Sequence, residues 1–199
     1  MCIIRAGPWF QMGLVMRLKL MSPNFTNMAC GQQCKRIFKV FFKHRFRSKR
    51  NGVIEIDISG EERELLKNLI AQLRELVLST SSEGPLDPSI RRLFPAAHAE
   101  NQELEREYQK TMRDQLLEKR LSNLDRVEQS LFDKELEPEA LSAWITIIND
   151  LRLVLGTHLD VSEEEELSLA DPNSPDHQQR AIYHYLSHLL GELVDVASI

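Results

Sequence analysis

Two cysteines, Cys30 and Cys34, stand four residues apart beside Lys35 and Arg36. Neighbouring cations stabilise a thiolate and lower the pKa of a thiol, which is what a redox-sensing thiol pair needs. The spacing is not the CxxC motif of thiol oxidoreductases, and the sequence has no second cysteine pair to complete a zinc site. The pair is therefore a candidate for oxidant sensing, and the alternative is two unreactive thiols in a solvated segment.

Two histidines, His184 and His188, are one turn apart in a predicted helix, so both fall on one face and could share a metal ion. A third ligand would have to come from His158 or from the run Glu163–Glu166, and there is no HExxH motif. Histidines on a helix surface and a solvated acidic loop explain the same residues more simply. We predict no metal site and no cofactor.

A third polar group, Asn149-Asp150-x-Arg152, lies in a predicted helix that is apolar around nearly its whole circumference. A buried charge must be paired, so we predict that Asp150 pairs with Arg91 or Arg92 of a short proline-bounded motif. Arg152 is expected to find an acceptor of its own. These five residues are predicted to form a structural polar network. With no GxSxG motif and no glycine-rich phosphate loop in the sequence, we predict no catalytic site.

The charge of the chain is strongly asymmetric. Residues 1–52 contain no Asp or Glu and carry 11 of the 25 basic residues, so the remaining 14 basic and all 30 acidic residues leave the rest with a charge of −16. A basic segment can bind nucleic acid through counterion release, or it can fold back onto its own acidic body. Residues 1–40 lack periodicity and are expected to form a poorly ordered arm. The candidates for nucleic-acid contact are Lys35, Arg36, Lys39, Lys43, Arg45, Arg47, Lys49 and Arg50.

A β-hairpin is predicted from residues 41–47 and 53–58, because Asn51-Gly52 supplies the positive φ angles of a tight turn. With a two-residue turn, Ile54 and Ile56 would share a face with Lys49 and Arg47. A longer turn would shift this register.

Capping signals and apolar periodicity predict the helices. Ser59 and Glu62 form a capping box, Pro138 suits a first helical turn, and residues 87–95 indicate a short capped turn ended by proline. Four helices are predicted, over residues 60–78, 99–132, 138–156 and 176–197. We expect a mainly α single domain over residues 41–199: a compact four-helix domain around the buried central helix 138–156, with a small N-terminal β-hairpin.

No stretch of the sequence offers the roughly 20 mostly apolar residues that a membrane-spanning helix needs. The first residues also lack an apolar core followed by a small-residue cleavage site, so we predict no secretory signal. The expected compartment is the cytoplasm.

Several of these landmarks occur together in one known family. The blocks are Asp87-Pro88-x-Ile90-Arg91-Arg92-Leu93-Phe94-Pro95, the pair Ala143-Trp144, Asn149-Asp150-Leu151-Arg152-Leu153-x-Leu155-Gly156-Thr157, and Tyr183-x-x-Leu186. Over about residues 44–199 the chain resembles the actinobacterial AosR-type oxidative-stress transcriptional regulators, formerly a domain of unknown function. The first 40 residues lie outside the resemblance, so Cys30 and Cys34 inherit no role from it.

The resemblance implies a non-enzymatic cytoplasmic regulator of transcription, with DNA or the transcription machinery as partner. Because the family often neighbours a Clp-protease adaptor in the genome, the alternative is a protein-interaction adaptor linked to Clp-type proteolysis. The sequence shows no helix-turn-helix, so DNA contact would come from the arm and hairpin or through a protein partner.

Overall fold

A computed structural model divides the chain into two units, residues 1–43 and 44–199. It describes residues 44–50, 52–79, 87–98, 100–161 and 176–198, all in the second unit. The predicted arm, residues 1–40, lies outside the described residues with its Cys30, Cys34, Lys35, Arg36 and Lys39, and so does Lys43. In chain order the elements are β1 (Phe46–Ser48), β2 (Ile54–Ile56), α4 (Gly60–Leu78), the 3₁₀ helix η2 (Pro88–Leu93), α5 (Gln102–Ser130), β3 (Glu135–Leu136), α6 (Pro138–His158) and α7 (His177–Ala197).

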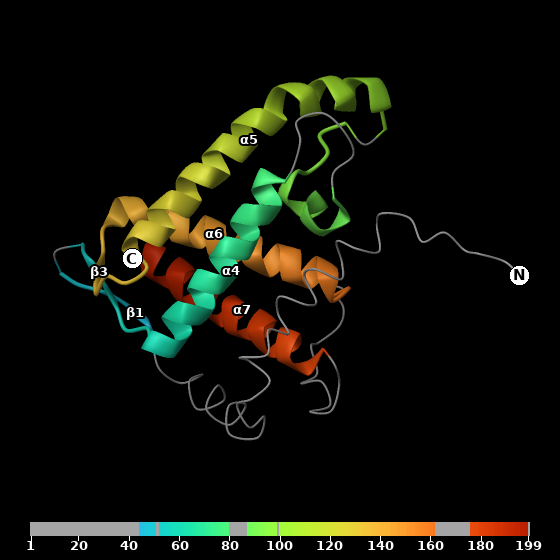
Figure 1. Ribbon diagram of the computed structural model, residues 1–199. Helices are drawn as coiled ribbons and strands as arrows, with labels where there is room; N and C mark the ends of the chain where they lie inside the picture. The colour runs from blue at the N-terminus through green and yellow to red at the C-terminus, as the bar shows by residue number, and fades with distance from the viewer. Residues whose placement is uncertain (1–43, 51, 80–86, 99, 162–175, 199) are drawn as a thin grey trace, which may run out of the picture. The chain divides into compact units, whose positions relative to one another are not determined.

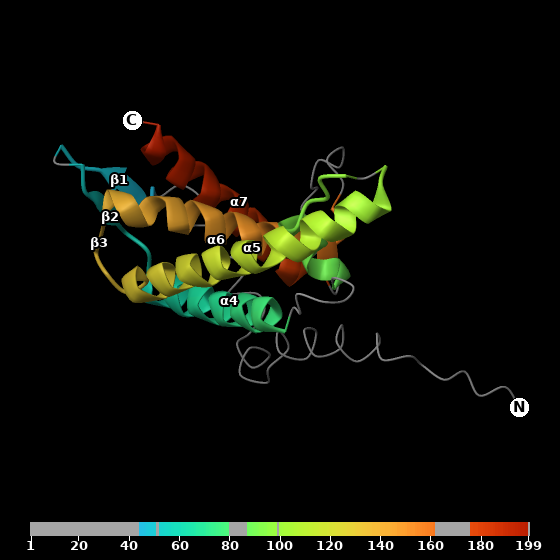
Figure 2. The ribbon, with the colours of Figure 1, turned by 90° about the horizontal axis from the view of Figure 1, so that it is seen from above.

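Helix α6 lies at the centre of the unit, with α7 against one side and α4 and α5 against the other (Figures 1 and 2). Trp144, Ile147 and Ile148 have no exposed surface. The Trp144 ring meets Phe46 of β1 edge to face at 5.8 Å, and its Nε1–H donates to Ser130 Oγ at 2.9 Å. The predicted mainly α domain around a buried central helix is confirmed.

The helix boundaries follow the local signals. The Ser59 side chain accepts from the Glu62 N–H and the Glu62 side chain accepts from the Ser59 N–H, so the predicted capping box starts α4. The Asp87 carboxylate accepts from the Ser89 N–H and starts η2. In α5 the apolar stripe is buried at Leu124 and Val127 and emerges at Leu104, because the helix extends beyond α4 (Figure 1).

The hairpin uses the longer turn. Lys49 N–H donates to the Val53 carbonyl at 2.9 Å, so the loop is one residue longer than Asn51-Gly52 alone, and Gly52 takes φ +82°. Phe46 therefore pairs with Ile56, and Ser48 with Ile54, in place of the cations expected from a two-residue turn. A third strand, β3, which the sequence did not predict, pairs antiparallel with β2.

Trp144→Ala should lower the free energy of unfolding by about 3–5 kcal/mol, because it empties a fully enclosed aromatic site. Phe132→Ala is the matched control, since the Phe132 side chain is 55% exposed and the change should stay within about 1 kcal/mol. Urea unfolding followed by circular dichroism measures both. Equal losses in the two variants would contradict the central position of α6.

Candidate functional site

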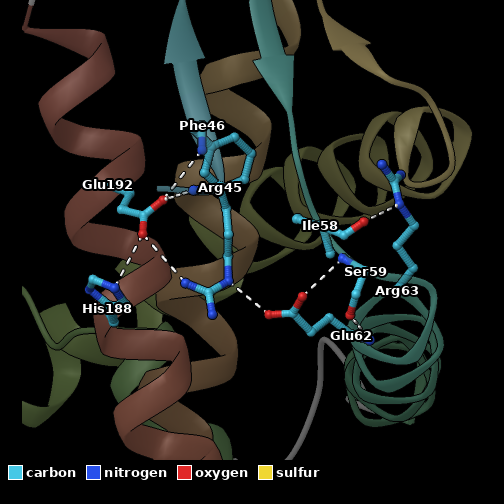
Figure 3. Close-up of polar contacts among 8 residues, drawn as sticks. All are labelled: Arg45, Phe46, Ile58, Ser59, Glu62, Arg63, His188 and Glu192. Carbon is cyan, nitrogen blue, oxygen red and sulfur yellow. Dashed lines mark hydrogen bonds and ion pairs between the residues drawn. The ribbon is translucent and has the colours of Figure 1, made fainter. Parts of the chain in front are cut away.

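A cluster of buried charge joins the hairpin to α4 and α7. Arg45, just before β1, is almost fully buried. Its guanidinium lies between two carboxylates, with Nε 2.8 Å from Glu62 Oε1 of α4 and Nη1 3.5 Å from Glu192 Oε1 of α7 (Figure 3). The same guanidinium lies over the Tyr185 ring, 5.3 Å from its centroid. This arrangement compensates an arginine that would otherwise be costly to bury.

Glu192 also binds the backbone at the edge strand of the sheet, β1. Its Oε2 accepts the backbone N–H of Arg45 at 2.6 Å and that of Phe46 at 3.3 Å. His188 Nε2, one turn earlier on α7, lies 3.2 Å from Glu192 Oε1 (Figure 3). One buried carboxylate thus satisfies two backbone N–H groups that an uncovered edge strand would leave open to another chain.

Two ionisation equilibria respond to this environment. Burial disfavours the Glu62 carboxylate, but hydrogen bonds from Arg45 and Ser59 outweigh that cost and hold its pKa below the usual range. Burial raises the pKa of the Tyr185 hydroxyl far above its ordinary value, and the Glu62 carboxylate adds to this shift. At neutral pH the cluster therefore contains a charged Glu62 and a neutral Tyr185.

This geometry corrects the list of nucleic-acid candidates. Arg45 is buried and ion-paired, so including it as a surface cation was wrong. Lys49 pairs with Glu135 at 2.6 Å. Arg47 is exposed, with a loose contact to Asp57 at 3.6 Å, and Arg50 is exposed at the turn.

Sequence reasoning missed a second buried arginine, Arg63. Its guanidinium donates to three carbonyls, those of Ile58 at 3.1 Å, Leu131 and Asp133 at 2.8 Å. These bonds fasten the start of α4 to the corner that follows α5. Spacing was the available signal, because Arg63 precedes Leu66 by three residues on the buried face of α4.

The partner of Asp150 is Arg120 of α5. Arg120 Nε lies 3.0 Å from Asp150 Oδ2, and its guanidinium lies over the Phe94 ring at 5.1 Å. The predicted pairing with Arg91 or Arg92 is wrong. The buried face of η2 carries Ile90 and Leu93, so the two arginines between them face solvent.

Burial raises the pKa of Asp150, and the charge and hydrogen bond of Arg120 offset only part of that shift. The pair is therefore a costly one that joins α6 to α5. Phe94, which follows η2, completes the contact through the Arg120 guanidinium.

The other members of the predicted network form a separate group. Arg152 Nη1 lies 3.5 Å from Asn149 Oδ1, and the guanidinium lies over the Tyr183 ring of α7 at 5.6 Å. A Cβ at Gly156 would stand 3.0 Å from Tyr183 Cε2, so glycine lets that ring approach α6. Arg152 thus has an acceptor, as predicted, and that acceptor is the Asn149 amide oxygen.

The two histidines take different roles. His188 lies against Glu192, whereas burial and the nearby charge of Arg180 lower the pKa of His184. Within the described ranges no group of three or more His, Cys, Asp or Glu residues could hold a metal ion. The charged side chains that are buried here hold elements together, as Arg45, Arg63 and Asp150 illustrate. None of the helices in the described ranges combines the length and apolar character that a membrane crossing requires.

Asp150→Ala should lower the free energy of unfolding by about 3–5 kcal/mol, because it leaves Arg120 facing the interior without its carboxylate. The double variant Arg91→Ala, Arg92→Ala is the control, and exposure of both side chains predicts a change of about 0.5 kcal/mol or less. Chemical denaturation separates the cases. A larger loss of unfolding free energy in the double variant would favour the pairing of Asp150 with Arg91 or Arg92.

Glu62→Gln should lower the free energy of unfolding by about 1.5–3 kcal/mol at pH 7, because it removes a charged hydrogen bond to Arg45 while glutamine keeps the capping box. The folded-state pKa is depressed, so the contribution is complete above the free-glutamate value, about 4.3, and is lost as pH falls below it. The free energies of unfolding of the parent protein and of Glu62→Gln, measured from pH 7 to pH 3, should therefore converge as the pH falls. Glu64→Gln, at an exposed 3.6 Å pair, should show little difference at any pH.

Comparison with known proteins adds the family. Searches among curated proteins and among solved structures found no match. The model of one protein family, described as "Domain of unknown function (DUF2017)", matches residues 43–197. The matched range contains the hairpin cluster, the Asp150–Arg120 pair and the Arg152–Tyr183 contact. Since the match covers most of the sequence, the chain belongs to the DUF2017 family.

Proposed function

We propose that this protein is a non-enzymatic cytoplasmic regulator of transcription in the oxidative-stress response, of the AosR type. The family match over residues 43–197 supports the proposal, because it covers the same range as the resemblance to those regulators. The observation that carries DNA contact is the separation of charge. Residues 1–43 hold 7 of the 25 basic residues and none of the 30 acidic ones, so residues 44–199 have a net charge of −12.

The structure of the hairpin reduces the number of its cations that could contact DNA. Arg47 and Arg50 are its exposed cations and continue the acid-free segment that precedes them. Arg45 and Lys49 are engaged with carboxylates of the domain itself. Phosphate contacts are therefore assigned to Arg47 and Arg50 together with Lys35, Arg36, Lys39 and Lys43.

The thiol pair Cys30 and Cys34 is the proposed origin of the oxidant response. Apart from Cys2, these are the cysteines of the chain, and Lys35 and Arg36 follow them directly. Oxidation there would act on the same basic segment that is assigned to DNA.

A protein-interaction adaptor linked to Clp-type proteolysis is the second candidate. The net charge of −12 over residues 44–199 favours it, because such a body repels phosphates and attracts basic protein surfaces.

The full chain should bind a 30-base-pair duplex of random sequence, with an affinity that falls steeply as salt rises. Arg47→Gln, Arg50→Gln should reduce the slope of log K against log salt by about 2, which is one phosphate contact per arginine. Fluorescence anisotropy between 50 and 200 mM salt measures the slope.

The control for this experiment is Arg91→Gln, Arg92→Gln, which removes two exposed arginines from η2 and should leave the slope unchanged. Absence of DNA binding at the lowest salt would reject the regulator in favour of the adaptor. An equal effect of both double variants would reject the hairpin as the contact.

A further inference from the structure

The arginines of the domain differ in whether the fold provides them with an acceptor. Those that are buried or half-buried and bonded to carboxylates or carbonyls are Arg45, Arg63, Arg74 and Arg120. Arg152 and Arg180 are also half-buried, yet neither has an ion-pair partner in the described part of the chain. Arg152 has a single long hydrogen bond, to Asn149 at 3.5 Å. Unsatisfied donors of this kind require an explanation.

Tyr183 connects the two arginines. The Arg152 guanidinium lies over its ring, with Cζ 5.6 Å from the ring centroid. Arg180 is three residues earlier on α7 and hence on the neighbouring helical surface. The close approach of the Tyr183 ring depends on Gly156 of α6, where any Cβ would lie 3.0 Å from the ring.

Three buried polar atoms without hydrogen-bond partners belong to Arg152 and to the residues of α7 next to Arg180 and Tyr183. Among the described residues, Arg152 Nε, Gln179 Oε1 and His184 Nε2 are inaccessible to solvent and have no hydrogen-bond partner. Gln179 precedes Tyr183 by one turn of α7, and His184 follows it directly. Burial and the nearby charge of Arg180 lower the pKa of His184, so the histidine lies within the electrostatic range of this arginine. The position combines two half-buried guanidiniums that have no carboxylate partner among the described residues.

We propose that Arg152, Arg180 and Tyr183 form a carboxylate-binding site that takes an acidic segment of a protein partner. A guanidinium that lies over an aromatic ring is partly positioned by it, and its fork of N–H groups can make two parallel bonds to one carboxylate. Nucleic acid fits less well, because a phosphate backbone is bound by a row of cations and this position offers two. This site is separate from the hairpin arginines assigned to DNA, so it stands or falls independently of that function.

The test is a titration of the full chain with an acetylated, amidated tripeptide of glutamate at 150 mM salt. The Arg152 Nε–H resonance, identified by its loss in Arg152→Lys, should move with saturation, and the resonances of Arg91 and Arg92 should not. The matching tripeptide of glutamine should leave all three in place. Arg180→Gln should weaken binding at least fivefold, whereas Arg91→Gln, Arg92→Gln should leave it unchanged.

Arg152→Lys keeps the charge but loses the fork, so it should also weaken peptide binding, measured by calorimetry, at least fivefold while the melting temperature stays near that of the parent. An unmoved Arg152 resonance, or the same affinity in Arg180→Gln as in the Arg91 and Arg92 variant, would overturn the site. Inorganic phosphate or duplex DNA that shifts the Arg152 resonance when the glutamate peptide does not would also overturn it, in favour of a phosphate site.

Discussion

The position of the small sheet depends on one buried carboxylate. β1 has only three residues, and a sheet so short contributes little stability by itself. Glu192 fixes it to α7 by accepting two consecutive backbone N–H groups and pairing with the Arg45 guanidinium, which also reaches Glu62 of α4. With the strand held there, Phe46 can close over Trp144. Phe46 thus covers the apolar core at that end of α6 because the polar contact with Glu192 holds its strand in place.

Two carboxylates of the domain, Glu62 and Asp150, respond to their surroundings in opposite ways. At the hairpin, hydrogen bonds from Arg45 and Ser59 overcome the burial of Glu62 and lower its pKa. Near the middle of α6, Asp150 has a single arginine against a stronger burial, and its pKa is raised. The number of donors around each carboxylate decides the direction. The Asp150–Arg120 pair therefore specifies how α5 meets α6 more than it stabilises that contact.

Local features were predictable from the sequence, and partners distant in sequence were not. The capping box, Pro138 and apolar periodicity placed α4, α6 and α7 within about two residues, because these signals act within one or two turns. The partner of Asp150 depended on which arginine the packing brings near it. Arg91 and Arg92 stood out because they lie in a short proline-bounded motif, but Ile90 and Leu93 take the buried face of η2. Arg45 looked like a surface cation because its two carboxylates lie 17 and 147 residues away.

That separation of 147 residues has a consequence for the order of assembly. During synthesis the hairpin leaves the ribosome long before α7, and β3 emerges between them. Until Glu192 arrives, Arg45 lacks one of its two carboxylates and the outer edge of β1 is open to other strands. In a nascent chain α4 and α5 can therefore pack together before α7 is available to hold the sheet in position. The final turns of α7 thus complete the fold, because Glu192 secures a strand that was made about 147 residues earlier.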